Sequence, residues 1–234
     1  MNQLNSLLGI ELSAVSHREK IVSMAGGLIS ILLVILVNER MFYLSGTLAV
    51  LASMGASAVL LFAVPHGQLS QPWPVIGGQV FSALIGVSCA RWIPLPEFAA
   101  AFAVGLSIGM MHQLKCIHPP GTATALTAVL GGDAIREMGF RFVIIPVLVD
   151  SVLMICIAVA FNMCFGWRRY PAGLRQLDIP ALPGTPSHED IVEALRSLDT
   201  FVDISEDDLL RLHRVLASGR VAGAAGGRNG SAAP

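Results

Sequence analysis

Long apolar runs, almost free of charge, are the feature that most limits how this chain can fold. A helix needs about 20 apolar residues to cross the hydrocarbon of a bilayer. The chain has several runs near that length, and 54% of its residues are hydrophobic while only 13% are charged. We therefore expect an all-α polytopic membrane protein. The six predicted membrane segments are residues 21–37, 44–64, 75–90, 98–114, 117–132 and 142–167.

Basic residues near the segment ends indicate the orientation, because Lys and Arg accumulate on the cytoplasmic side. With both termini in the cytoplasm, the inner side receives Arg18, Lys20, Lys115, Arg168, Arg169 and Arg175, and the outer side receives Arg40, Arg91, Arg136 and Arg141. We expect a plasma membrane protein, of the bacterial inner membrane. Its predicted parts are a cytoplasmic N-terminal segment (1–20), a transmembrane transport domain (21–169), a cytoplasmic linker with a helical hairpin (170–218) and a disordered tail (219–234).

The fifth apolar segment is abnormal because it begins with His118, Pro119 and Pro120. Proline fits the first turn of a helix, and it disfavours helix in the residue before it. A helix is therefore expected to start at Pro119 or Pro120, with His118 at or near its cap. From there to Gly131 is at most 13 residues, or about 20 Å, which is shorter than the hydrocarbon core of about 30 Å. The sequence predicts a half-helix that begins inside the membrane.

A short internal similarity supports this interpretation. Residues 55–60 (GASAVL) and 121–126 (GTATAL) share a glycine, small or hydroxyl residues and a leucine, 66 residues apart. Each belongs to the middle member of a group of three segments, and groups of three place their equivalents in opposite orientations. We therefore expect a 3+3 inverted repeat with two broken helices, as in many secondary transporters. The second break is predicted near Ser53 to Gly55, with a short helix running to Pro65.

A helix start inside the membrane presents unpaired N–H groups and a partial positive charge. Two such starts facing each other would bind an anion, with small residues allowing close approach and hydroxyls donating hydrogen bonds. His118 would either donate to the anion or cap its helix. The alternative is that the small residues only let helices pack closely. The candidate binding residues are Ser53, Gly55, Ala56, Ser57, His118, Gly121, Thr122, Ala123 and Thr124, with Pro119 and Pro120 shaping the half-helix.

Four blocks of the sequence resemble the HPP family of integral membrane proteins, which is named for the His-Pro-Pro motif. They are SMGASAVLLFAVP (53–65), LSQPWPVIGGQVFSALIGV (69–87), AVGLSIGMMHQLKCIHPPGTATAL (103–126) and FNMCFGWRRYP (161–171). The resemblance implies a polytopic, transporter-like protein, and it implies nitrite as a substrate because plant chloroplast and cyanobacterial members are associated with nitrite transport. Some bacterial members carry paired CBS domains after the membrane part, and we expect this chain to lack them.

Other polar residues in the apolar segments are functional candidates. The candidates for coupling or gating are Asp150, Lys115 and Gln79. Asp150 either binds a coupling proton or makes a structural hydrogen bond, with Gln79, Ser82 or Lys115 as the expected partner. Lys115 either draws anions inward or extends its amine to the cytoplasmic surface. We interpret Arg168 and Arg169, at a segment end, as cytoplasmic anchors.

Neither a metal nor a cofactor is expected. The three histidines His66, His112 and His118 lack an acid or a cysteine at a supporting spacing, and the four cysteines are interpreted as packing residues. Beyond Pro171, two helices with capping motifs at Ser187 and Ser205 are expected to dock on the membrane part or on a second copy, so that a homodimer is favoured.

Taken together, these patterns predict transport of a small monovalent anion, with nitrite the first choice. The alternative is a membrane sensor or scaffold that binds a regulatory anion and signals through its cytoplasmic tail. We expect neither enzymatic activity nor a nucleic-acid partner. The sequence lacks the ordered constellation of residues that catalysis requires.

Overall fold

The computed structural model describes residues 15–42 and 48–174, together with positions 189–191, 193, 203, 208–210, 212 and 213 of the C-terminal region. These residues form helices and connecting turns, and no strand is present among them. The predicted all-α class is therefore confirmed. The N-terminal segment before residue 15, most of the predicted hairpin and the tail at 219–234 lie outside the described residues.

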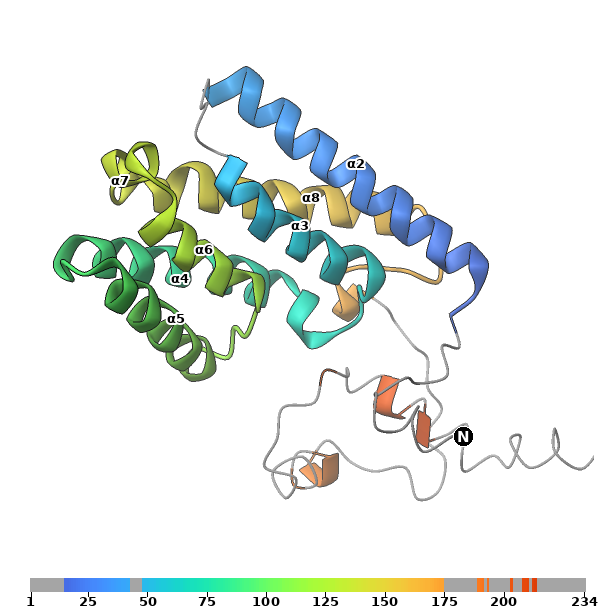
Figure 1. Ribbon diagram of the computed structural model, residues 1–234. Coiled ribbons are helices and arrows are strands. Elements are labelled where there is room, and N and C mark those ends of the chain that lie inside the picture. Colours follow the sequence, from blue (N-terminus) through green and yellow to red (C-terminus); the bar gives the residue numbers. More distant parts are fainter. Residues whose placement is uncertain are drawn as a thin grey trace, which may run out of the picture.

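Each of the six predicted segments contains a helix (Figure 1). Proline stands in the first turn of α4, α5 and α6, where its missing N–H removes no intrahelical hydrogen bond. The α-helices of the described residues are α2 (His17–Phe42), α3 (Leu48–Ala63), α4 (Pro72–Trp92), α5 (Pro96–Gln113), α6 (Pro120–Leu130), α7 (Asp133–Met138) and α8 (Val149–Met163). Three shorter helical turns are η1 (Gln68–Ser70), η2 (Val143–Leu148) and η3 (Ala172–Leu174).

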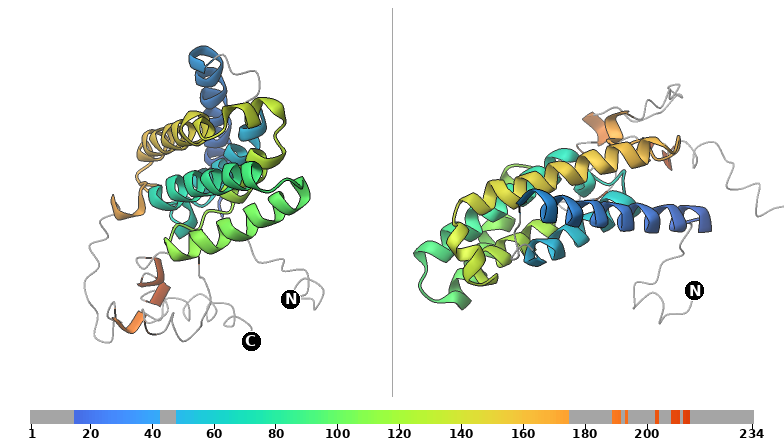
Figure 2. Two further views of the ribbon diagram at one scale, coloured as in Figure 1. Left: turned by 90° about the vertical axis from the view of Figure 1, so that its left-hand side faces the viewer. Right: turned by 90° about the horizontal axis from the view of Figure 1, so that it is seen from above.

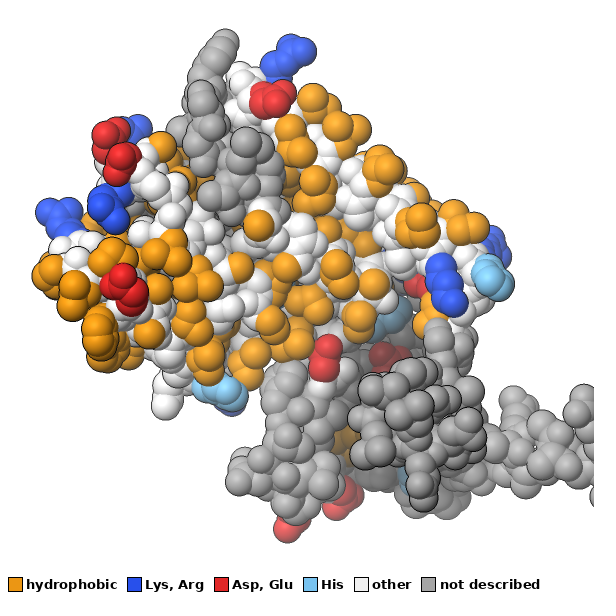
Figure 3. Space-filling view, in the orientation of Figure 1, with side chains coloured by type: hydrophobic (Ala, Val, Ile, Leu, Met, Phe, Trp, Pro, Cys, Tyr) orange, Lys and Arg blue, Asp and Glu red, His pale blue; other side chains and the backbone are white. Residues whose placement is uncertain are grey.

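Three helices of the described region are long and apolar enough to cross a membrane without help. They are His17–Arg40, Pro72–Trp92 and Val143–Met163, the last of which joins η2 to α8. The space-filling view shows charged side chains mainly at the two ends of the helical body and hydrophobic ones between them (Figure 3). This distribution is the one that a bilayer requires of an embedded protein.

Helix α4 lies at the centre of the packing. It contacts α5, α6, η2 and α8, while α3 contacts α2, α6 and α8. The long helices run side by side when the molecule is seen from above (Figure 2, right). Glycine lets α4 and α6 approach closely, because a Cβ at Gly86 would lie 2.6 Å from the carbonyl oxygen of Ala125.

The structure confirms one predicted helix start and contradicts another. Helix α6 begins at Pro120, with Pro119 at its N-cap, and ends at Leu130. In contrast, α3 runs unbroken through Ser53 and Gly55, so the break predicted there is wrong. No proline or helix-ending pair stands at that point of the sequence, and the likeness to residues 121–126 does not include the residues that break the chain.

The last membrane segment contains an irregularity that the sequence analysis did not anticipate. Ile145 has extended φ and ψ angles, −126° and 113°, and Pro146 follows it inside the wide turn η2. Pro146 has no N–H to give to a helical ladder, and it disfavours helical angles at the residue before it. The segment therefore bends just before α8 begins.

Arg168 is not the surface anchor that its position at a segment end suggested. Its side chain is buried and forms an ion pair with Glu19 at the start of α2. Its Nε donates to Asn162 Oδ1 at 3.0 Å, and Nη2 donates to the carbonyl of Phe62 at the end of α3. Burial lowers the pKa of Arg168, and the charge of Glu19 opposes that effect. The residue joins α2, α3 and α8 at one end of the molecule.

Candidate functional site

Five polar side chains meet inside the helical body. Ser53 and Ser57 lie one turn apart on α3, Gln79 is on α4, His118 precedes α6, and Thr124 is in its second turn. All five are fully buried. In a membrane protein such residues are costly to bury and mark functional sites by default. We call this set the polar network.

The hydrogen bonds of the polar network have one consistent set of directions. The Gln79 amide nitrogen donates to Ser53 Oγ at 2.8 Å and to Ser57 Oγ at 3.1 Å. Ser53 in turn donates to the carbonyl oxygen of Pro120 at 2.8 Å, because a carbonyl can only accept. Thr124 donates to Gln79 Oε1. Every side-chain donor of Gln79, Ser53 and Thr124 therefore has an acceptor.

His118 extends the polar network to the turn before α4. Its Nδ1 lies 2.9 Å from the carbonyl oxygen of Leu69, which requires a proton on Nδ1. Its Nε2 lies 2.8 Å from Ser57 Oγ. A buried imidazole without an ionic partner is expected to be neutral, so Nε2 accepts a hydrogen bond from the Ser57 hydroxyl. His118 therefore contacts the network as an acceptor and η1 as a donor.

The start of α6 differs from the anion site predicted from the sequence. The N–H of Gly121 donates to the His118 carbonyl at 2.8 Å, and the N–H of Thr122 donates to the Pro119 carbonyl at 3.1 Å. Pro119 and Pro120 have no N–H. The groups that were predicted to be unpaired are thus paired within the chain in this structure.

Two glycines set the distance between α4 and the start of α6. A Cβ at Gly78 would lie 2.5 Å from the Cβ of His118 and 3.0 Å from the carbonyl oxygen of Cys116. A Cβ at Gly121 would collide with the carbonyl of Gly78. Close packing is therefore the role that the structure gives to Gly121, and this packing brings His118 to the network.

The remaining predicted site residues lie apart from the polar network. Ala56 is exposed, and a Cβ on Gly55 would meet nothing within 4 Å. Ala123 is partly exposed, and Thr122 donates its hydroxyl to the Pro119 carbonyl. Lys115 is exposed on the turn before His118, with a positive φ of 53°. The network therefore contains four of the nine predicted binding residues and adds Gln79, which the sequence had suggested for coupling or gating and as a partner of Asp150.

Asp150 has a partner that the sequence analysis did not name. The amide of Asn38, on α2, donates to Asp150 Oδ1 at 2.8 Å. Among the described residues no hydrogen bond joins Asp150 to Gln79, and Lys115 forms no ion pair with it. Ser82 Oγ, on α4, is buried without a hydrogen-bond partner. The three partners expected for Asp150 are therefore not the ones observed.

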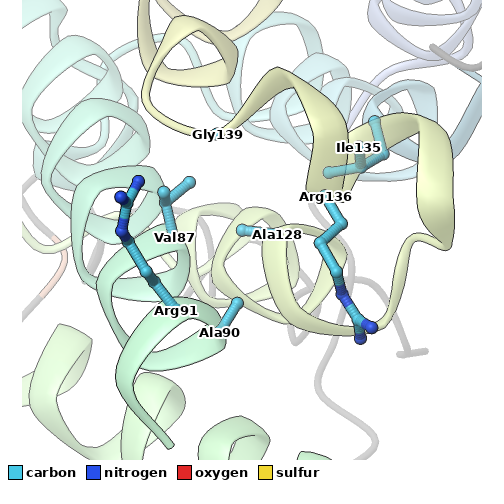
Figure 4. Close-up of a pocket in the computed structure, with 7 residues that line it drawn as sticks. All are labelled: Val87, Ala90, Arg91, Ala128, Ile135, Arg136 and Gly139. Atoms are coloured by element: carbon cyan, nitrogen blue, oxygen red, sulfur yellow. The ribbon is translucent and has the colours of Figure 1, made fainter.

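Two pockets adjoin the helices without being lined by the polar network. One of about 210 Å³ lies between α4, α6 and α7, and Arg91 and Arg136 line it from opposite sides (Figure 4). The other, of about 360 Å³, is an apolar groove between α2 and α3 that includes Gly55. The first is the one with positive charge.

Comparison with known proteins shows to which protein family this chain belongs. The transmembrane region of the HPP family matches residues 12–171, which is more than half of the sequence. The chain belongs to the HPP family. Within it, the His-Pro-Pro motif is His118, Pro119 and Pro120, so the polar network forms where the motif meets α3 and α4.

Two curated relatives come from Dictyostelium discoideum, and both are named only as transmembrane proteins. One is 37% identical over 61% of this chain and 47% of its own length, and the other is 38% identical over 52% and 44%. The chain thus spans less than half the length of these relatives. No solved structure matches the chain. The HPP family assignment and the apolar helices together show an integral membrane protein.

Proposed function

We propose that this HPP family protein transports a small monovalent anion, with nitrite as the first candidate. The observation that carries the proposal is the polar network, which is buried beside the half-helix α6 in a transmembrane protein. Its three hydroxyls and one amide are donors suited to a small anion such as nitrite. They are neutral, so an anion bound there would not be held as tightly as by a fixed charge, which favours release.

The proposed binding step is an exchange of acceptors. In the closed arrangement the hydroxyl of Ser53 donates to the Pro120 carbonyl and that of Ser57 donates to His118 Nε2. A small rotation of these hydroxyls, together with movement at the start of α6, would direct them to an anion. The anion would then receive the hydrogen bonds that the carbonyl and the imidazole now accept, and the buried donors would never be left unpaired.

We further propose six membrane crossings arranged as a 3+3 inverted repeat. In such a repeat α2, α3 and α4 correspond to α5, α6 and α8. The helix contacts support this arrangement, because helix pairs in contact map onto other pairs in contact when corresponding helices are exchanged. Helix α2 contacts α3 as α5 contacts α6, α2 contacts α8 as α5 contacts α4, and α3 contacts α8 as α6 contacts α4. Within the described residues, the break at the start of α6 has no counterpart inside α3.

A positively charged pocket at one end of α4 fits an entry point for anions. The pocket between Arg91 and Arg136 lies at the end of α4 opposite to Pro72, and its two guanidinium groups would concentrate anions there. We propose that this end faces the cell exterior and that both termini are cytoplasmic in a plasma (bacterial inner) membrane. We also propose a homodimer that uses neither a cofactor nor a nucleic-acid partner and has no enzymatic activity.

The test is nitrite uptake into proteoliposomes, with chloride, nitrate and formate as competitors. His118→Ala and Ser57→Ala should each abolish or strongly reduce saturable uptake, whereas Ser88→Ala should not. Ser88 is on α4 like Gln79, but it donates to its own helix, to the Leu84 carbonyl. Equal uptake by all variants, or no uptake of any anion by well-folded protein, would refute the transport proposal.

A membrane sensor is the second candidate, and one contact favours it. Asp203, in the region after the membrane helices, accepts a hydrogen bond from the N–H of Leu69 at 3.2 Å. The carbonyl of Leu69 in turn accepts a hydrogen bond from His118 Nδ1. A change at His118 could thus reach the C-terminal region through Leu69. Anion-dependent protection of residue 203 and its neighbours in hydrogen exchange, without flux, would support the sensor.

A further inference from the structure

A second buried polar pair lies between α2 and α8, apart from the polar network. Asn38 has an exposed fraction of 4% and Asp150 of 0%. The Asn38 amide nitrogen donates to the carbonyl of Val34 at 2.9 Å and to Asp150 Oδ1 at 2.8 Å. Both of its amide hydrogens are therefore used, and the two acceptors fix which way the amide faces, because its oxygen would face an oxygen at either position.

Each member of the pair has one oxygen left without a partner. These atoms are Asn38 Oδ1 and Asp150 Oδ2, and both are buried. Two acceptors cannot satisfy each other, and a buried polar atom without a hydrogen bond carries a free-energy cost. A single proton placed on Asp150 Oδ2 would supply the missing donor for Asn38 Oδ1.

The charges around the pair do not stabilise an ionised carboxylate. Among the described residues no Lys, Arg or His forms an ion pair with Asp150. Glu39 and Arg40, which follow Asn38, are exposed, and the other charges of α2 lie in its first turn. Helix α3 and η2 carry no ionisable residue, and on α4 the buried Cys89 belongs to the core against α5 while Arg91 is exposed. An unpaired charge in such surroundings is costly.

We propose that Asp150 is protonated in the folded protein and that its O–H donates to Asn38 Oδ1. The two side chains then form a neutral acid–amide pair with two hydrogen bonds, from the amide N–H to Asp150 Oδ1 and from the acid O–H to the amide oxygen. The pair is a proton-binding site. When the proton leaves to water, the two unpartnered oxygens repel each other and the contact between α2 and α8 weakens.

A proton fits this site better than a metal ion does. The described residues contain no group of three or more His, Cys, Asp and Glu side chains that could hold a metal. The nearest hydroxyl along the chain, that of Ser151, already donates to the Val147 carbonyl at 2.7 Å. Two free oxygens are too few for a hard cation, which takes about six oxygen ligands.

The pair would matter for transport in one way, and this step rests on the proposed function. Helix α8 also packs against α3 and α4, which carry most of the polar network. Loss of the proton would therefore change the support of the helices that hold the proposed anion site, so that the rate of anion transport would depend on pH. The proton site itself does not depend on this step and is tested separately.

The first test is infrared difference spectroscopy of wild type against Asp150→Asn in detergent or lipid at neutral pH. We expect the C=O band of a protonated carboxylic acid that is missing in Asp150→Asn, remains in the control Glu39→Gln, and shifts in Asn38→Val. Absence of a protonated band from Asp150 would overturn the proposal. A band that ignores Asn38→Val would overturn the pairing with Asn38.

Thermal unfolding provides the second test, and it does not require transport. The asparagine introduced by Asp150→Asn mimics the protonated acid, because its N–H can donate to Asn38 Oδ1. The folded wild type holds one proton that the unfolded chain releases near neutral pH, so its folding constant should fall by up to about tenfold per pH unit as the pH rises. Asp150→Asn should lose that slope and match wild type at acidic pH. The same slope in both proteins, or stabilisation of wild type by sodium ions, would overturn the proton site, while pH-independent nitrite uptake would overturn only its coupling to transport.

Discussion

Gln79 offers the sharpest test of how the polar network is built. Its amide makes three hydrogen bonds, two as donor to Ser53 and Ser57 and one as acceptor from Thr124. Replacing it by leucine removes all three. Thr124 can then donate to Ser53 Oγ, which lies 2.7 Å away, so no hydroxyl is left without an acceptor. The cost is therefore a net loss of two hydrogen bonds.

The magnitude follows from this count. Hydrogen bonds between membrane helices are worth about 0.6 kcal/mol on average, and leucine gains little because lipid tails are as apolar as its side chain. Three bonds are lost and one is gained, and the net loss of two bonds corresponds to about 1 kcal/mol, or a fall in Tm of about 2 to 4 °C for a chain of this size. Gln79→Glu should cost several kcal/mol at neutral pH, because it buries a charge without a cation. At acidic pH the introduced carboxyl group is protonated and can donate again, so the loss should shrink.

The assay is tryptophan fluorescence during heating of purified protein in one detergent, with Ser88→Ala as the control on the same helix. We expect the order Ser88→Ala, Gln79→Leu, Gln79→Glu from most to least stable. If Gln79→Leu were as stable as the control, or if Gln79→Glu were the more stable of the two, the hydrogen-bond directions deduced for the network would be wrong.

Three further predictions follow from the same contacts. Arg168→Ala should destabilise the protein by about 3 kcal/mol in thermal unfolding, because it leaves the buried acceptors Asn162 Oδ1 and the Phe62 carbonyl without a donor and the partly buried Glu19 without its cation. Exposed Arg169 provides the matched control, and Arg169→Ala should have little effect. Gly78→Ala should displace His118 and reduce nitrite uptake more than Gly105→Ala, whose added Cβ meets nothing within 4 Å; equal uptake would contradict the packing argument. Replacing Pro119 and Pro120 by alanine should lengthen α6 and reduce uptake, and unchanged flux would show that the half-helix is not needed.

Much of the fold could be predicted from the sequence because its signals are local. Apolar length located a helix in each of the six segments, and the proline pair located the start of α6 to within one residue. The break predicted in α3 failed because it was transferred from residues 121–126 by similarity, although Ser53 to Gly55 lack the prolines that interrupt a helix. Pro146 does interrupt a helix, but the sequence analysis treated residues 142–167 as one segment on hydropathy alone and did not consider this proline.

The site was predicted only in part because its members depend on contacts far apart in the sequence. Ser53, Ser57, His118 and Thr124 were recognised from small residues and hydroxyls near the motif, but Gln79 joins them across 45 residues from Thr124. A glutamine in an otherwise apolar helix was the available signal. Arg168 was misinterpreted for the same reason, since a basic residue at a segment end is normally exposed and its partner Glu19 is 149 residues away.

The polar network and the buried Asn38–Asp150 pair restrict how the protein could work. The polar network is complete without a ligand, so the proposed anion could bind only when the acceptors at Pro120 and His118 are withdrawn. That withdrawal would move the start of α6 relative to α3, because the acceptors are at the start of α6 and their donors, Ser53 and Ser57, are on α3. The Asn38–Asp150 pair is positioned to affect this movement through α8, which packs on both α3 and α4. A proton there would therefore influence access to the anion site without contacting the anion, which places pH dependence in the rate of opening and leaves anion selectivity to the network.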